Sequence, residues 1–89
     1  MKKLVSVTEV DGEGMIGLMG EQVMLFCLNY IYTGKLVGVN DSCVQLESPK
    51  IVYETGAFSD KNIKDAQALP FVLYVQTAAI ESFGKTDKR

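Results

Sequence analysis

The chain has 89 residues, of which 47% are hydrophobic and 22% are charged, and its formal net charge at pH 7 is −2. This length supports one domain with a modest core, and this composition excludes the disordered and fibrous classes. No apolar run approaches the roughly 20 residues that a membrane span needs, and Met1-Lys2-Lys3 is not followed by the apolar region of a signal peptide. We therefore expect a cytoplasmic protein without a membrane segment.

The side chains that usually carry catalysis or bind metals are scarce. The sequence has no histidine and two cysteines, so a zinc site of the usual kind is not expected. Cys27 and Cys43 lie in apolar runs, which favours buried free thiols over a disulfide. No glycine-rich phosphate loop and no nucleophile with an evident base is present. We expect no enzyme activity, no catalytic residue, no metal and no cofactor.

Residues 1–21 are predicted to form an N-terminal arm and loop. Valines alternate in Leu4–Val10, which indicates a short strand or an extended arm that pairs with a neighbour. Glu13–Gly20 contains three glycines, so we expect a loop there with one helical turn.

The next run, Gln22–Leu28, is apolar on both faces of the predicted strand. Its two faces carry Val23, Leu25 and Cys27 on one side and Met24, Phe26 and Leu28 on the other. A small barrel has a single interior, so the second face needs another cover. Either the rest of the same chain or a second subunit could cover this face.

Tyr30–Glu47 predicts a β-hairpin, because two runs rich in β-branched and aromatic residues flank the polar turn Asn40-Asp41-Ser42. Gly34 and Gly38 lie inside the first run, where glycine weakens an ordinary strand. They indicate sharp bends or close backbone approaches, as in a small, tightly curled barrel.

Ser48-Pro49-Lys50 predicts a second turn, after which Ile51–Glu54 would run back along Val44–Glu47. Thr55–Leu69 is the one long polar segment, and within it Ser59 could cap a short helix that Pro70 ends. This segment is either a functional loop or a solvated connection.

Two last strands are predicted at Phe71–Val75 and Ala78–Phe83, hinged at Gln76-Thr77, and residues 84–89 are predicted to be a frayed polar tail. The fold class is therefore all-β. It is a five-stranded, strongly bent antiparallel small barrel over residues 22–83, with a short helix allowed in the 55–69 insertion.

Two stretches resemble the sequence motifs of the Sm/LSm-like family of small β-barrels. Tyr32–Val39 matches the opening of the first motif, whose aspartate falls on Asn40 or on Asp41, and in the second alignment Gln45 replaces the family's asparagine. Val75–Ile80 keeps the apolar skeleton of the second motif, with Gln76-Thr77 where the family has Arg-Gly. The resemblance is to a divergent member, of the kind that phage and marine microbial genomes carry.

The resemblance implies a homo-oligomeric ring of about five to seven subunits that closes the open sheet edges. It also implies binding of single-stranded RNA, or DNA, as a scaffold or chaperone. The implied contact residues come from the two loops: Asn40, Asp41, Ser42, Gln45, Gln76 and Thr77. Apart from the resemblance, the positive charges of Lys35 and Lys50 could meet phosphates.

An alternative function stays open. Gln76 lacks the charge and the planar stacking surface of an arginine, and the net charge is acidic. Tyrosines in strands often serve packing, and scattered lysines often serve only to keep a surface hydrated. The chain would then be a structural or protein-interaction ring, for example a phage-encoded one, without nucleic-acid binding. If the chain does bind nucleic acid, stacking surfaces for the bases could come from Tyr30, Tyr32, Tyr53 and Tyr74.

Overall fold

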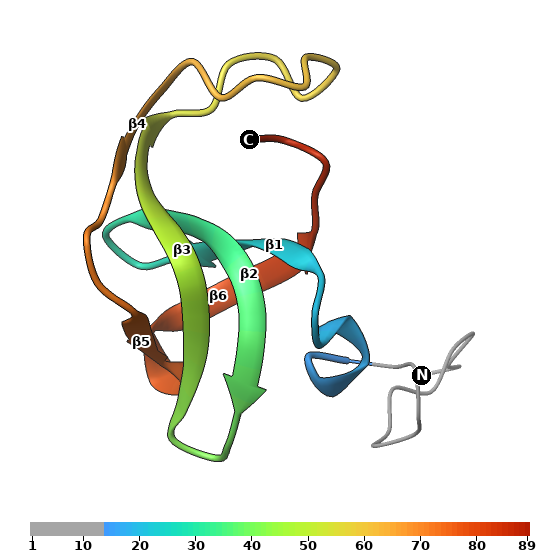
Figure 1. The fold of residues 1–89 in the computed structure, drawn as a ribbon, viewed down its shortest axis with the longest axis vertical. Coiled ribbons are helices and arrows are strands. Elements are labelled where there is room, and N and C mark those ends of the chain that lie inside the picture. Colours follow the sequence, from blue (N-terminus) through green and yellow to red (C-terminus); the bar gives the residue numbers. More distant parts are fainter. Residues whose placement is uncertain (1–13) are drawn as a thin grey trace, which may run out of the picture.

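The computed structural model describes residues 14–89, and the strand or arm predicted at Leu4–Val10 lies outside them. The predicted helical turn in the glycine-rich stretch is confirmed as a 3-10 turn, η1 (Ile16–Leu18). The later elements are β1 (Gln22–Cys27), β2 (Ile31–Val39), β3 (Cys43–Glu54), β4 (Asp65–Ala68), β5 (Leu73–Gln76), a second 3-10 turn η2 (Thr77–Ala79) and β6 (Ile80–Lys85) (Figure 1).

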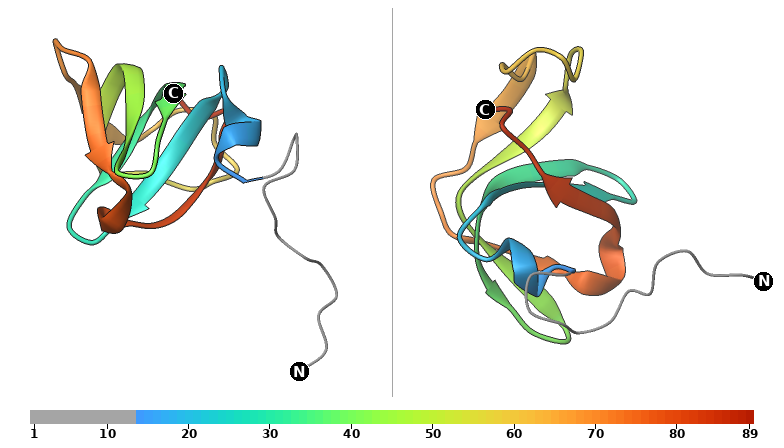
Figure 2. Two further views of the ribbon diagram at one scale, coloured as in Figure 1. Left: turned by 90° about the horizontal axis from the view of Figure 1, so that it is seen from below. Right: turned by 90° about the vertical axis from the view of Figure 1, so that its right-hand side faces the viewer.

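The strands form one antiparallel sheet in the order β4-β3-β2-β1-β6, and β5 also pairs with β3. The all-β, antiparallel prediction is confirmed, but residues 14–89 form six strands instead of five. Within residues 14–89 the two ends of this order, β4 and β6, do not pair with each other. The sheet therefore curls around the core without closing into a barrel (Figure 2).

The hairpin predicted at Tyr30–Glu47 is confirmed as β2 and β3, with residues 40–42 as its loop. Both glycines of β2 lie where the pairing register with β3 shifts. A Cβ atom on Gly34 would lie 3.1 Å from Leu46 Cβ, and one on Gly38 would lie 3.3 Å from Gln45 Cβ. The close approaches that the sequence predicts are therefore present at both positions.

The turn predicted at Ser48-Pro49-Lys50 is wrong. β3 continues through these residues as one strand with a bend, and both of its halves pair with β2, through Lys35↔Glu47 before the bend and Thr33↔Lys50 after it. Ser48 takes the left-handed φ of 50°, which turns the strand sharply without reversing it. The bend lies opposite Gly34, whose missing Cβ leaves room for Pro49.

The short helix predicted in the 55–69 insertion is also wrong, because Asp65–Ala68 forms β4 instead. An isolated helix of this length is marginal unless tertiary packing supports it. Without β4, the outer edge of this half of β3 would leave backbone groups unpaired. β4 pairs with it through Lys50↔Ala68 and Val52↔Ala66. Strand pairing with β3 thus prevails over the local helical preference.

The core lies between β1, β2, β3 and β5, and its buried cluster consists of Val23, Leu25, Leu36, Val44, Leu46 and Val75. On the opposite face of β1, Met24 is also buried and Phe26 packs against Phe58, with ring centroids 6.4 Å apart. The chain itself thus covers part of the second apolar face of β1. Leu28, just beyond the strand, remains 72% exposed.

The predicted boundary of the C-terminal tail is not observed. Gly84 and Lys85 belong to β6, which pairs with β1. Lys88 is only 3% exposed, and its Nζ donates hydrogen bonds to three backbone carbonyls of the 55–64 segment, those of Ala57, Asp60 and Asn62, at 2.8, 2.7 and 2.8 Å. This ammonium group ties the end of the described chain to that segment.

Candidate functional site

The loop between β2 and β3 is held by the side chain of its first residue. Asn40 Oδ1 accepts hydrogen bonds from the backbone N–H of Ser42 at 2.8 Å, from its hydroxyl at 3.0 Å and from the N–H of Cys43 at 2.9 Å. Such Asx turns arise because a short amide side chain can replace a backbone acceptor. The amide oxygen of Asn40 therefore shapes the loop, and its NH2 group can meet a ligand.

The second predicted loop lies beside the first. Thr77 Oγ1 donates a hydrogen bond to the carbonyl of Asp41 at 2.9 Å, and the N–H of Thr77 donates to the carbonyl of Ser42 at 3.0 Å. Gln76, the last residue of β5, pairs with Cys43 at the start of β3. We call the surface formed by the exposed residues Asn40, Asp41, Ser42 and Gln76 and the half-buried Thr77 the two-loop surface; the strands that carry it are seen in Figure 1.

The other predicted site residues lie away from the two-loop surface or beside it. Gln45 pairs with Gly38 and Tyr74 within the sheet. Lys35 lies inside β2, opposite Glu47, about 13 Å of strand length from Val39 at 3.3 Å per residue. Lys50 lies beyond the Ser48 bend. The structure therefore brings together the polar loop residues and leaves both predicted phosphate contacts elsewhere.

A pocket of about 230 Å³ opens next to the two-loop surface, between the β1–β2 turn, β5 and η2. We call it the tyrosine pocket. Its lining includes Cys27, Asn29, Tyr30, Tyr32, Tyr74 and Gln76. The rings of Tyr30 and Tyr32 are tilted by 53° with centroids 6.2 Å apart. No charged residue lines this pocket among residues 14–89.

Sequence reasoning names these tyrosines as stacking surfaces but does not place them in one pocket. Tyr30 and Tyr32 are two residues apart, so their presence on one side of a strand was foreseeable. Tyr74 comes from β5, and only the pairing of β5 with β3 and the turn η2 bring it near. The pocket can therefore be recognised only from the tertiary structure.

Two groups at the tyrosine pocket have raised pKa values. Burial raises the pKa of the Cys27 thiol above its ordinary value. The pKa of the Tyr32 hydroxyl is raised first by burial, then by the negative charges that Cys27 and Tyr30 would carry when ionised. Both groups are therefore neutral at pH 7, which keeps the pocket uncharged.

Alkaline pH is expected to destabilise the fold through Cys27. The folded pKa is raised, so this contribution to stability is complete below the unfolded pKa, about 8.5, and is lost as pH rises through the folded pKa. Urea unfolding at about pH 7 and pH 9.5 checks this. Cys27→Ser should lose less stability between these pH values than the wild type, with Cys43→Ser as the control for removal of a thiol. An equal loss in all three proteins would contradict the assignment.

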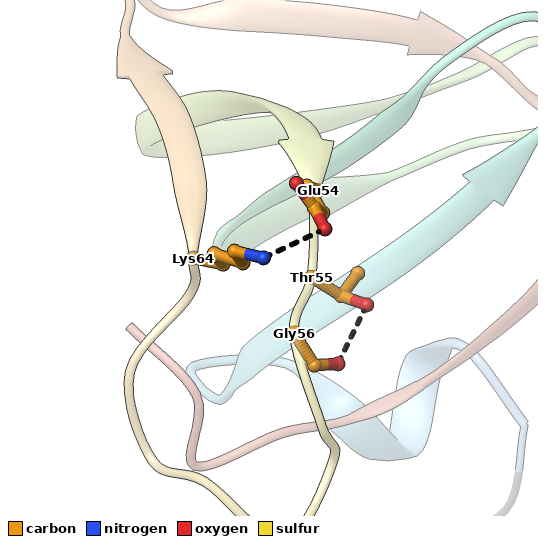
Figure 3. Close-up of polar contacts among 4 residues, drawn as sticks. All are labelled: Glu54, Thr55, Gly56 and Lys64. Atoms are coloured by element: carbon orange, nitrogen blue, oxygen red, sulfur yellow. Dashed lines mark hydrogen bonds and ion pairs between the residues drawn. The ribbon is translucent and has the colours of Figure 1, made fainter.

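A second hollow, of about 590 Å³, lies inside the segment from Glu54 to Lys64. Figure 3 shows Lys64 reaching back to Glu54, with Nζ 3.2 Å from Oε1, and Thr55 Oγ1 donating to the carbonyl of Gly56 at 3.0 Å. Both members of the ion pair are more than half exposed, so it adds little stability. Because Lys88 already occupies the nearby carbonyls, we interpret this segment as structural and not as a binding site.

Residues 14–89 contain no group of three Cys, Asp or Glu side chains that could hold a metal ion. None of the helical turns in this described part is long and apolar enough to cross a membrane. No protein-family model, curated protein or solved structure matches this chain at a significant level.

Proposed function

We propose that this chain is a divergent Sm-like protein of the cytoplasm that assembles into a homo-oligomeric ring and binds single-stranded nucleic acid at the two-loop surface. The observation that carries the proposal is the pair of hydrogen bonds from Thr77 to the carbonyls of Asp41 and Ser42. They hold together the two loops from which the resembled family contacts bases. Fold-level analogy contributes the rest of the argument.

The unpaired strand edges support the assembly. β4 and β6 stand at opposite ends of the strand order, and each pairs with only one strand in the described chain. An edge left open invites pairing with another chain. If β4 of one subunit pairs with β6 of the next, the contact is heterologous and can repeat around a closed ring. Phe83 of β6 is 42% exposed and would gain burial there.

The chemistry of the two-loop surface fits bases better than phosphates. The amides of Asn40 and Gln76 can donate and accept hydrogen bonds with base edges. Lys35 and Lys50 lie elsewhere, and Asp41 is exposed on the surface itself. We therefore expect few phosphate contacts and a shallow dependence of affinity on salt.

The placement of the lysines also favours a second candidate function. A ring without basic groups at its loops would have no electrostatic attraction for a nucleic-acid backbone. In that case the protein would act as a structural or protein-interaction ring. The two functions differ in whether oligonucleotides bind at low salt.

Titration of fluorescently labelled single-stranded RNA and DNA oligomers over a salt series separates them. We expect saturable binding that weakens with salt. We expect Gln76→Glu to weaken binding about tenfold, since a carboxylate repels phosphates and cannot donate to a base. Asn62→Asp, which adds the same charge at an exposed position of the 54–64 segment, outside the two-loop surface and the strand edges, is the control. Ring size, measured by light scattering, should not change in either variant.

Two outcomes would contradict the proposal. Rings that bind no oligomer even at low salt would favour the structural function. Equal affinity of wild type and Gln76→Glu would remove the two-loop surface as the contact site.

A further inference from the structure

The tyrosine pocket holds an arrangement that the two-loop surface does not use. Tyr30 and Tyr74 are 52% and 62% exposed, although both are large aromatic side chains beside a concave site. Aromatic rings at the rim of a pocket are suited to stacking against another flat ring.

We propose that the tyrosine pocket takes a single flat, uncharged aromatic ring, namely one unpaired base of the strand bound at the two-loop surface. The inference rests on the function proposed above and deepens it, because it assigns a base-binding site on the β1–β2 turn and β5. The occupant follows from the size, the polarity and the position of the pocket.

The size favours one ring system. The volume is about 230 Å³, below the range of about 300 to 1,000 Å³ that is usual for drug-sized ligands. Tyr30 and Tyr32 are tilted and their centroids are 6.2 Å apart, so a base would stack on an outer face and not between them. Stacking of this kind tolerates any base, because every base has a π face.

The polarity favours a neutral ligand with hydrogen-bonding edges. Asn29 and Gln76 contribute amide groups, which offer both donors and acceptors. Within residues 14–89, no carboxylate lines the pocket to pair with a cation and no lysine or arginine lines it to pair with an anion. The raised pKa values of Cys27 and Tyr32 are consistent with a neutral ligand, because both side chains stay uncharged at pH 7.

The position connects the pocket to the two-loop surface. Gln76 belongs to both, and the next residue, Thr77, donates its hydrogen bonds to the β2–β3 loop. A single strand that crosses this loop can therefore turn one base into the pocket without leaving the surface. RNA recognition commonly uses bases that are splayed out and stacked in this way.

Cys27 lines the pocket and provides a direct readout, whereas Cys43 is a free thiol on β3 that does not line it. Alkylation of each cysteine by iodoacetamide is followed by mass spectrometry of its peptide, in the full-length protein. We expect a single-stranded oligomer to slow alkylation of Cys27 severalfold. An abasic oligomer of the same length, which keeps the phosphates and lacks the bases, should leave the rate unchanged.

Tyr30→Leu should remove the protection and weaken oligomer binding about tenfold, as expected for the loss of one stacked base. Tyr74→Leu tests the β5 side of the pocket in the same way. Tyr53→Leu, at an exposed tyrosine on β3 outside the pocket, is the matched control and should behave as wild type. All these side chains are exposed, so the fold should persist, which circular dichroism checks.

The failures can be distinguished. An oligomer that binds without protecting Cys27, and equally to Tyr30→Leu, would overturn the pocket and leave the proposed function standing. Protection by millimolar nucleoside without any oligomer binding would keep a ring-binding pocket and overturn the function. Absence of both effects would overturn both. Alkylation of Cys27 that slows with rising protein concentration, as the subunits assemble and without any ligand, would show a subunit contact instead and overturn the inference.

Discussion

Replacement of Gly34 by alanine is expected to lower the free energy of unfolding by about 2 to 3 kcal/mol, the upper part of the usual cost of overpacking. The new Cβ would lie 3.1 Å from Leu46 Cβ, 3.2 Å from the carbonyl oxygen of Glu47 and 3.3 Å from Pro49 Cα. Two of these atoms belong to the backbone of β3, so a side-chain rotation cannot relieve the contact. Urea unfolding followed by circular dichroism measures the change.

Gly84→Ala is the matched control for this prediction. Gly84 also lies in a strand, β6, but a Cβ there would meet no atom of residues 14–89 within 4 Å. Alanine at this position should be neutral or slightly stabilising, because it reduces the entropy of the unfolded chain. Comparable destabilisation by the two variants would show that the Gly34 effect does not come from the close approach to β3.

Replacement of Lys88 by methionine is expected to destabilise the protein by about 3 kcal/mol. Lys88 is 3% exposed and its ammonium group donates to three carbonyls, so the loss of this group removes three charge-assisted hydrogen bonds. Methionine keeps most of the apolar stem, which limits the loss of packing. The same urea titration measures the effect, and limited proteolysis should show faster cleavage in the 57–63 segment.

Lys85→Met is the control for removal of a positive charge near the same end of the chain. Lys85 is more than half exposed, and its Nζ lies 3.3 Å from Glu21 Oε2. Exposed pairs of this kind contribute at most about 1 kcal/mol. If Lys88→Met unfolded as easily as Lys85→Met and no more, the buried ammonium would not be what holds the tail to the insertion.

The local patterns that predicted the fold correctly are those with one dominant cause. The alternation of β-branched and aromatic residues around Asn40-Asp41-Ser42 identified the hairpin, because the turn chemistry and the strand preference agree there. Gly34 and Gly38 indicated the close approaches, because glycine weakens the interior of a strand and usually marks a bend or a near backbone contact there. Both cysteines are free, as their apolar surroundings predicted, but they are half-buried instead of buried.

The errors arose where pairing with a strand distant in the sequence overrode a local pattern. Ser48-Pro49-Lys50 fits a turn, yet the strands on both sides of it pair with the same partner, β2, so the chain only bends. The segment from Ser59 to Gln67 fits a short helix, yet the edge of β3 provides pairing for Asp65–Ala68. In both cases a distant strand decided, and local propensity carries no information about that strand.

The candidate site divides in the same way. The two polar loops were identified from the sequence, whereas their contact through Thr77 depends on the pairing of β5 with β3. Lys35 and Lys50 were assigned to phosphates from their charge, and the register places them away from the two-loop surface. The tyrosine pocket required the β1–β2 turn, β5 and η2 to meet.

The sequence alone determined the all-β class, the central hairpin, the close backbone approaches at two glycines and the apolar run of β1. These features depend on side-chain sterics and on contacts between residues near in sequence. The tertiary structure decided the bend at Ser48, the strand at β4, the buried position of Lys88 and the assembly of the tyrosine pocket. Each of these depends on hydrogen bonds or packing between segments far apart in the chain, whose free energy exceeds the small local preferences.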